Sequence, residues 1–180
     1  MSYRQLFLFV EGADDERFFL SIVVPLLRGA YDHIQSVKLR PLKKEKVRGF
    51  LRSIAAMKAD YILVHDLDQL PCASAAKDRI LKTYPQADPD RIQIVKAEIE
   101  SWYCAGIPDG HPWGSLEIGR CLETSIVTKE RFEAAVAQEG QSRLLAMLAL
   151  LESFDREAAV LRNESFRRFL RKFVAPVTGA

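Results

Sequence analysis

The sequence has few cysteines, and their arrangement fits neither a disulfide framework nor a metal site. The three cysteines, Cys72, Cys104 and Cys121, are odd in number and scattered, with no CxxC spacing among them. Disulfide-rich domains and cysteine-based zinc sites both need cysteines in closely spaced pairs. The sequence therefore predicts a protein of a reducing compartment, and we expect it in the cytoplasm.

Long hydrophobic runs and an excess of one charge are also lacking. The apolar run at 6–10 is too short for the core of a signal peptide, and no later run approaches the length that crosses a membrane. We therefore expect no membrane association. The 26 basic residues face 24 acidic ones, and a net charge of +2 does not by itself indicate nucleic-acid binding.

Several catalytic patterns are missing as well. The sequence contains no glycine-rich phosphate loop, no serine–histidine–aspartate arrangement and no context for a nucleophilic cysteine. It also contains no internal repeat and no low-complexity segment. Its balance of 48% hydrophobic and 28% charged residues is that of an ordinary globular protein, so function has to be sought in other residues.

Two kinds of apolar spacing alternate in the first part of the chain. Strands are predicted at 6–10, 34–42, 61–64 and 91–95, the second of them half buried or near an edge. Helical spacing predicts helices at 14–26, 45–59, 74–84 and 98–106. Pro25 is expected to end or kink the first helix, and Ser74 to cap the third. This alternation predicts an α/β fold with a four-stranded, mostly parallel sheet flanked by helices.

The pattern changes after residue 106. Residues 107–119 are rich in proline and glycine and read as a loop or linker, whereas 128–173 have helical spacing almost throughout. We therefore expect an α/β domain at 1–106, a linker at 107–127 and a helical subdomain at 128–180 that packs on the α/β domain.

Acidic residues follow three of the four predicted strands. Glu11 follows the first strand, Asp66 and Asp68 follow the third, and Glu98 and Glu100 follow the fourth. The carboxyl ends of parallel strands meet at one edge of the sheet, and residues two apart on an extended chain point the same way. Crowded carboxylates repel unless a hard cation binds them, so the sequence predicts a Mg²⁺ or Mn²⁺ site. The last two acids are open to a second reading, since acids also favour the start of a helix.

The stretch VEGADD at 10–15 and the aspartate pair DLD at 66–68 resemble the motifs of the Toprim domain. Toprim domains occur in topoisomerases, bacterial primases, small RNA-maturing nucleases and the overcoming-lysogenization-defect (OLD) nucleases. The resemblance covers residues 5–105. The runs EIESWYCAG at 98–106 and SFRRFLRKF at 165–173 are similar to small stand-alone Toprim-like proteins that are related to the OLD nucleases and associated with phage defence.

The resemblance implies a role for each matching acid. Glu11 matches a glutamate that acts as a metal ligand or as a general acid or base, and the aspartate pair matches the metal-binding pair. Asp15 matches an acid four residues after that glutamate, and Glu98 or Glu100 matches a later acid of the nuclease branch. His65, which precedes the aspartate pair, is expected to be structural.

Other parts of these larger enzymes have no counterpart here. We expect neither the tyrosine nucleophile and gate domains of topoisomerases nor the template-binding domains of primases. The ATPase domain of the OLD nucleases is also missing from the sequence, which implies that any ATPase partner is encoded separately.

Basic residues favour a phosphate-bearing substrate. One group follows the second predicted strand and consists of Arg40, Lys43, Lys44, Lys46, Arg48 and Arg52. A second group lies near the end of the chain, interleaved with phenylalanines, and consists of Arg162, Arg167, Arg168, Arg171 and Lys172. The first group is expected to flank the acidic site and to contact backbone phosphates, whereas the second reads as a solvated helix face whose phenylalanines enter the core.

The sequence therefore predicts a divalent-metal-dependent nuclease or phosphodiesterase. Metal ligands are expected among Glu11, Asp15, Asp66, Asp68 and Glu100, and catalytic groups among Glu11, Asp66, Asp68 and Glu98. The alternative is a non-catalytic Toprim-like scaffold that works through a partner ATPase. A phosphatase of the haloacid-dehalogenase type fits less well, because Leu70 stands where that family carries a threonine. A response-regulator receiver would need a fifth strand that ends in lysine. The choice between DNA and RNA and the oligomeric state stay open.

Overall fold

The computed structural model describes residues 3–112 and 122–178. Internal contacts divide the chain into one compact unit of Met1–Ile94 with Val174–Ala180 and another of Val95–Phe173. The predicted limits of the α/β domain, the linker and the helical subdomain stay predictions, and so does the predicted packing of the helical subdomain on the α/β domain. Residues 113–121 of the predicted linker lie outside the described part of the chain. In that described part, no helix is both long enough and apolar enough to span a membrane.

The first unit contains a parallel sheet of four strands in the order β2-β1-β3-β4, so the predicted α/β class is confirmed. The strands are β1 (Gln5–Val10), β2 (His33–Lys38), β3 (Asp60–Asp66) and β4 (Ile92–Val95). Strand β2 lies at an edge of the sheet and is half exposed, as its mixed polar and apolar sequence predicted.

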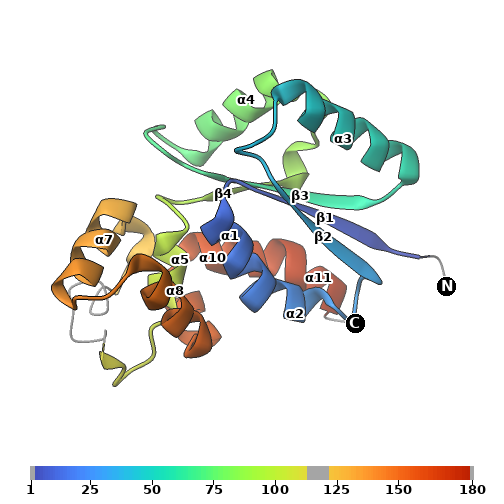
Figure 1. Cartoon of the computed structure of the whole chain (residues 1–180). Helices are drawn as coiled ribbons and strands as arrows, with labels where there is room; N and C mark the ends of the chain where they lie inside the picture. Colours follow the sequence, from blue (N-terminus) through green and yellow to red (C-terminus); the bar gives the residue numbers. More distant parts are fainter. Residues whose placement is uncertain (1–2, 113–121, 179–180) are drawn as a thin grey trace. The chain divides into compact units, whose positions relative to one another are not determined.

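Helices cover both faces of this sheet (Figure 1). Helices α3 (Lys44–Met57) and α4 (Ala73–Thr83) lie on one face, and α1 (Ala13–Phe18), α2 (Val24–Leu27) and α11 (Ala175–Thr178) lie on the other. Side chains of β1 are buried against both layers, which explains its continuous apolar sequence.

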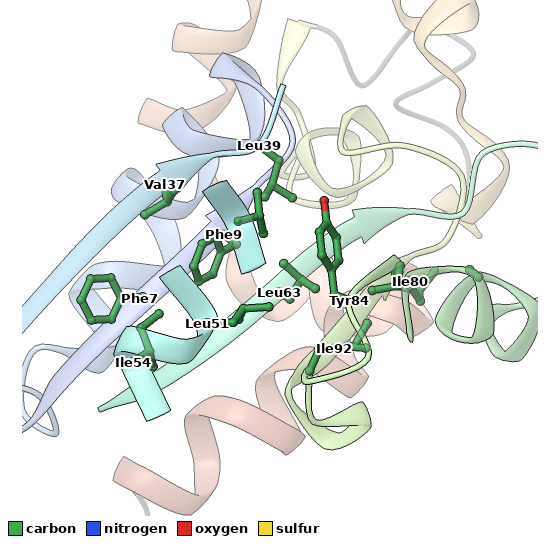
Figure 2. Close-up of a cluster of buried hydrophobic side chains, with 14 residues drawn as sticks. Phe7, Phe9, Val37, Leu39, Leu51, Ile54, Leu63, Ile80, Tyr84 and Ile92 are labelled. Carbon is green, nitrogen blue, oxygen red and sulfur yellow. The ribbon is translucent and has the colours of Figure 1, made fainter. Parts of the chain in front are cut away.

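The core between the sheet and α3 and α4 is drawn in Figure 2. Phe7 and Phe9 of β1 and Leu63 of β3 pack there against Leu51 and Ile54 of α3. Because side chains alternate along a strand, the intervening β1 residues face the opposite layer, where they are also fully buried. This two-sided burial holds β1 and β3 rigidly beside each other and so fixes the position of the residues at their ends.

Two local details differ from the predictions. The first helix does not end at Pro25 but continues to Leu27, after a π-helical segment at Phe19–Val23, and the alternative that Pro25 kinks the helix stays a prediction. The wider winding just before the proline accommodates its missing N–H group and its bulky ring. The N-cap of α4 is Cys72 and not Ser74, whose hydroxyl lies 3.0 Å from the Cys72 sulfur.

The second unit is helical. Its helices are α5 (Glu100–Ala105), α7 (Lys129–Gln138), α8 (Arg143–Glu152), α9 (Arg156–Arg162) and α10 (Glu164–Phe169), followed by π-helical Leu170–Val174. The helical spacing predicted for 128–173 is interrupted at Asn163, whose backbone is extended and whose side-chain oxygen accepts a hydrogen bond from the Phe166 N–H. The indole of Trp102 packs on Phe166 and Phe169 at 5.1 and 5.4 Å between ring centres.

Candidate functional site

The loops after β1 and β3 lead to helices on opposite faces of the sheet. The chain leaves β1 for α1 on one face and leaves β3 for α4 on the other, although β1 and β3 are neighbours. In parallel α/β sheets this reversal opens a crevice at the carboxyl ends of the two strands, and ligands bind there. Glu11 directly follows β1 and Asp66 is the last residue of β3, so both lie at the carboxyl ends of these two strands.

The Glu11 carboxylate connects the ends of the two strands. Its Oε1 accepts a hydrogen bond from the Asp66 N–H at 3.1 Å and lies 3.0 Å from Nδ1 of His65. Its Oε2 makes no hydrogen bond with any residue that the structure describes. One oxygen of Glu11 is therefore held by the protein, and the other is available to a ligand.

The surroundings of Glu11 favour its charged form. Burial alone raises the pKa of a carboxyl group, but the hydrogen bond and charge of His65 oppose it, helped by the Asp66 N–H and the charge of Arg40. The pKa of Glu11 consequently lies below its ordinary value. Glu11 is therefore ionised at neutral pH, as a metal ligand or a general base must be.

Arg40 lies beside Glu11 because Gly12 leaves room for it. The Arg40 N–H donates to the Glu11 carbonyl at 3.1 Å. A Cβ atom added to Gly12 would lie 3.3 Å from Nη1 of Arg40, closer than ordinary van der Waals contact. The glycine of the VEGADD stretch thus lets an exposed guanidinium approach the carboxylate.

Asp15 has a structural contact in α1. It is buried, and its Oδ2 accepts a hydrogen bond from the Gly12 N–H at 3.0 Å. This is the helix-capping contact expected of an acid at the third helical position. The predicted metal-binding role of Asp15 stays a prediction.

The two aspartates of the DLD stretch are in different environments. Asp66 belongs to β3 and is 8% exposed, whereas Asp68 lies beyond the strand and pairs with Arg79 of α4 at 2.8 Å. The sequence argument assumed extended backbone through both residues, and this assumption is wrong, because Asp68 has a left-handed φ of 50°. The strand therefore places Asp66 next to Glu11, and the turn directs Asp68 to Arg79.

Glu98 and Glu100 belong to the second unit, where both make structural contacts. Glu98 accepts a hydrogen bond from the Lys129 N–H at the start of α7. Glu100 is 3% exposed and forms an ion pair with Arg143 of α8. These contacts favour the second reading of both acids, in which they support helices. In the described part of the chain, no cluster of three or more potential metal ligands is found.

We expect Arg143→Met to destabilise the protein by up to about 3–5 kcal/mol at neutral pH, because it leaves the Glu100 carboxylate buried without its partner. Burial already raises the pKa of Glu100 despite Arg143, and loss of the arginine raises it further. A group with a raised folded-state pKa takes up a proton on folding, so the deficit should shrink as the pH falls towards the ordinary pKa of glutamate.

Urea unfolding at about pH 7 and about pH 5 measures this effect. Arg168→Met is the control, because Arg168 pairs with Glu164 at an exposed position, where an ion pair is worth only about 0.3–0.5 kcal/mol. Equal losses for the two variants, or a deficit that grows as the pH falls, would contradict the buried-pair account.

The predicted basic group divides into two kinds of residue. Lys43, Lys44 and Lys46 are exposed around the first turn of α3 and form no ion pair with any described residue. Arg48 instead donates two hydrogen bonds, at 3.0 and 2.8 Å, to the Thr83 carbonyl at the end of α4. The three lysines are free to meet a ligand, whereas Arg48 joins α3 to α4.

The later basic residues make contacts within their own unit. Arg162 donates to the Ile107 carbonyl, Arg168 pairs with Glu164, and the Lys172 ammonium lies over the ring of Phe173. The phenylalanines between them are buried. The phenylalanines of this segment therefore enter the core, as predicted.

The contact between His65 and Glu11 was not predicted from the sequence. The pairing of β1 with β3 sets Phe9 opposite Leu63, so Glu11 and His65 stand opposite each other when the register is continued by two residues. No feature of the sequence reveals this register, and the histidine therefore looked like a strand residue. The available signal was its place directly before the aspartate pair.

In comparisons with protein-family models, with curated proteins and with solved structures, the chain has no significant match.

Proposed function

We propose that the protein is a divalent-metal-dependent nuclease or phosphodiesterase that acts on nucleic acid. The observation that carries this proposal is the ionised Glu11 carboxylate, held through one oxygen at the carboxyl ends of β1 and β3, next to the last residue of β3. The resemblance of these residues to the Toprim motifs supports the same reading.

Glu11 and Asp66 suit Mg²⁺ or Mn²⁺. Mg²⁺ commonly keeps several waters and binds through one or two carboxylates together with substrate phosphates. A pair of carboxylates at the strand ends meets this requirement, and Asp68 is available as a third ligand if it leaves Arg79. A metal bound here would polarise the scissile phosphate and lower the pKa of an attacking water. Glu11 would bind this metal through its free oxygen.

The lysines at the start of α3 supply the substrate contact. Helix α3 follows β2, so its first turn lies at the carboxyl edge of the sheet, the same edge as Glu11. Lys43, Lys44 and Lys46 contribute positive charge there, and the start of a long helix adds unpaired N–H groups. Such contacts bind backbone phosphates and do not distinguish base sequences.

We expect Mn²⁺ to bind to the purified protein and to support cleavage of labelled DNA or RNA, because the candidate ligands are carboxylate oxygens. Calorimetry with Mn²⁺, Mg²⁺ and Zn²⁺ measures the binding, and gel assays with each metal or with chelator measure the cleavage. Binding of Mn²⁺ that is unchanged in Glu11→Gln, or cleavage that continues in chelator, would contradict the proposal.

A second candidate function is a non-catalytic scaffold that works with a separately encoded ATPase in phage or mobile-element defence. Two observations favour it. Asp68 is held by Arg79, and the described residues contain no cluster of three or more potential metal ligands. Wild-type protein that binds nucleic acid but cleaves neither DNA nor RNA with any metal would favour the scaffold. Turnover of a phosphomonoester without nuclease activity would instead favour a phosphatase.

A further inference from the structure

We propose that His65 is a positioning residue for Glu11. Together with the Asp66 N–H, it holds Oε1 of Glu11 and thereby presents Oε2 to the metal ion. This inference rests on the proposed metal-dependent function, and it assigns a role to a side chain that is not itself a predicted ligand.

The hydrogen bonds at Glu11 carry the argument. Two donors from β3, the His65 ring and the Asp66 backbone, converge on the same oxygen of Glu11 at 3.0 and 3.1 Å. A glutamate side chain has several rotatable bonds and loses conformational freedom when it is held in one arrangement. In this protein the Glu11 side chain is already restricted before a ligand binds, because its two hydrogen-bond donors lie on β3 and both β1 and β3 are packed on both faces.

The tautomer of His65 follows from its partner. An ionised carboxylate only accepts hydrogen bonds, so the hydrogen between the two groups must be on Nδ1 of His65. The other ring nitrogen, Nε2, is buried and has no hydrogen-bond partner among the described residues. The ring thus makes its one hydrogen bond to Glu11, which is the geometry of a residue that orients another.

Two substitutions separate this hydrogen bond from the bulk of the ring. His65→Leu fills similar space without a donor, whereas His65→Asn places an amide N–H near the position of Nδ1–H. His33→Leu is the matched control, because His33 is exposed on the edge strand β2, and no described residue forms a hydrogen bond with its side chain. Each variant is tested as the full chain.

We expect His65→Leu to weaken Mn²⁺ binding by about 10- to 100-fold, the usual effect of losing a group that orients a metal ligand. His65→Asn should recover most of the affinity, and His33→Leu should bind as wild type does. In a Glu11→Gln background, His65→Leu should cause no further loss, because the two residues act as one unit. Calorimetry gives the affinities, and the electron paramagnetic resonance spectrum of bound Mn²⁺ reports the change at the metal.

The outcomes distinguish the inference from the function on which it rests. If wild type binds Mn²⁺ and His65→Leu binds it equally well, the positioning role is overturned and the metal site stands. A lower unfolding midpoint with unchanged Mn²⁺ affinity would show that His65 is only structural. Additive losses in the double variant would show that His65 acts independently of Glu11. If wild type binds no Mn²⁺, the proposed function falls and the positioning role falls with it.

Discussion

Asp66→Asn is expected to abolish nuclease activity while the protein stays folded. The substitution keeps the size of the side chain but removes the negative charge of the last residue of β3, whose backbone N–H binds the Glu11 carboxylate. Loss of one group that stabilises the reacting charges lowers kcat by about 10²- to 10³-fold, and loss of the metal ion itself would lower it further. Asp66 is buried, and burial disfavours a charged carboxylate, so its replacement by a neutral amide should not lower the unfolding midpoint without metal.

Asp60→Asn is the matched control for this experiment. Asp60 lies at the opposite end of the same strand, where it pairs with Arg91 at 2.7 Å and accepts a hydrogen bond from the Tyr31 hydroxyl at 3.1 Å. Its replacement should lower stability by about 1 kcal/mol, because a partly exposed ion pair is lost. Its activity should stay close to that of wild type.

Cleavage assays measure the activity of both variants, and urea unfolding measures their stability. If Asp66 is catalytic, the two variants should differ in which of these properties is lost. The proposal predicts a loss of activity only for Asp66→Asn and a loss of stability only for Asp60→Asn. A marked fall in the stability of Asp66→Asn would show that Asp66 is structural. Activity near the wild-type level in that variant would remove Asp66 from the mechanism.

Replacing Lys43, Lys44 and Lys46 together with glutamine is expected to weaken nucleic-acid binding and to reduce its dependence on salt. Each phosphate contact releases condensed counterions, so log affinity falls with log salt by about 0.7–0.9 per contact. The triple variant should therefore have a slope smaller by up to about 2–3 if all three lysines contact phosphate. The loss should be similar for unrelated sequences, because phosphate contacts do not read bases.

The control replaces Lys58, Lys77 and Lys82 with glutamine, which changes the net charge by the same amount. Lys58 lies at the end of α3, and the other two lie on α4 away from its first residues. Fluorescence anisotropy at several salt concentrations should give this control a slope close to that of wild type. If both triple variants reduce the slope equally, binding reflects overall charge and not a surface at the start of α3. If wild type binds neither DNA nor RNA at low salt, the nuclease proposal falls and the scaffold takes its place.

Some of these features are encoded locally and were predictable from the sequence. Burial on two faces produces a continuous apolar run such as β1, and one helix face buried against the sheet produces the helical spacing of α3. The alternation of the two patterns therefore predicted the parallel sheet. It also placed Glu11 and Asp66 at strand ends, because a strand ends where its apolar run ends.

Other features depend on contacts between residues far apart in the sequence, so only the tertiary structure decided them. The register of β1 against β3 sets His65 opposite Glu11, and a run of apolar residues fits several registers equally well. The left-handed turn at Asp68 and its ion pair with Arg79 separate two aspartates that a short spacing appeared to join. The partner of Glu100 is also a feature of the tertiary structure. An acid at the start of a helix has the same sequence pattern whether it binds a ligand or, as here, pairs with an arginine from another helix.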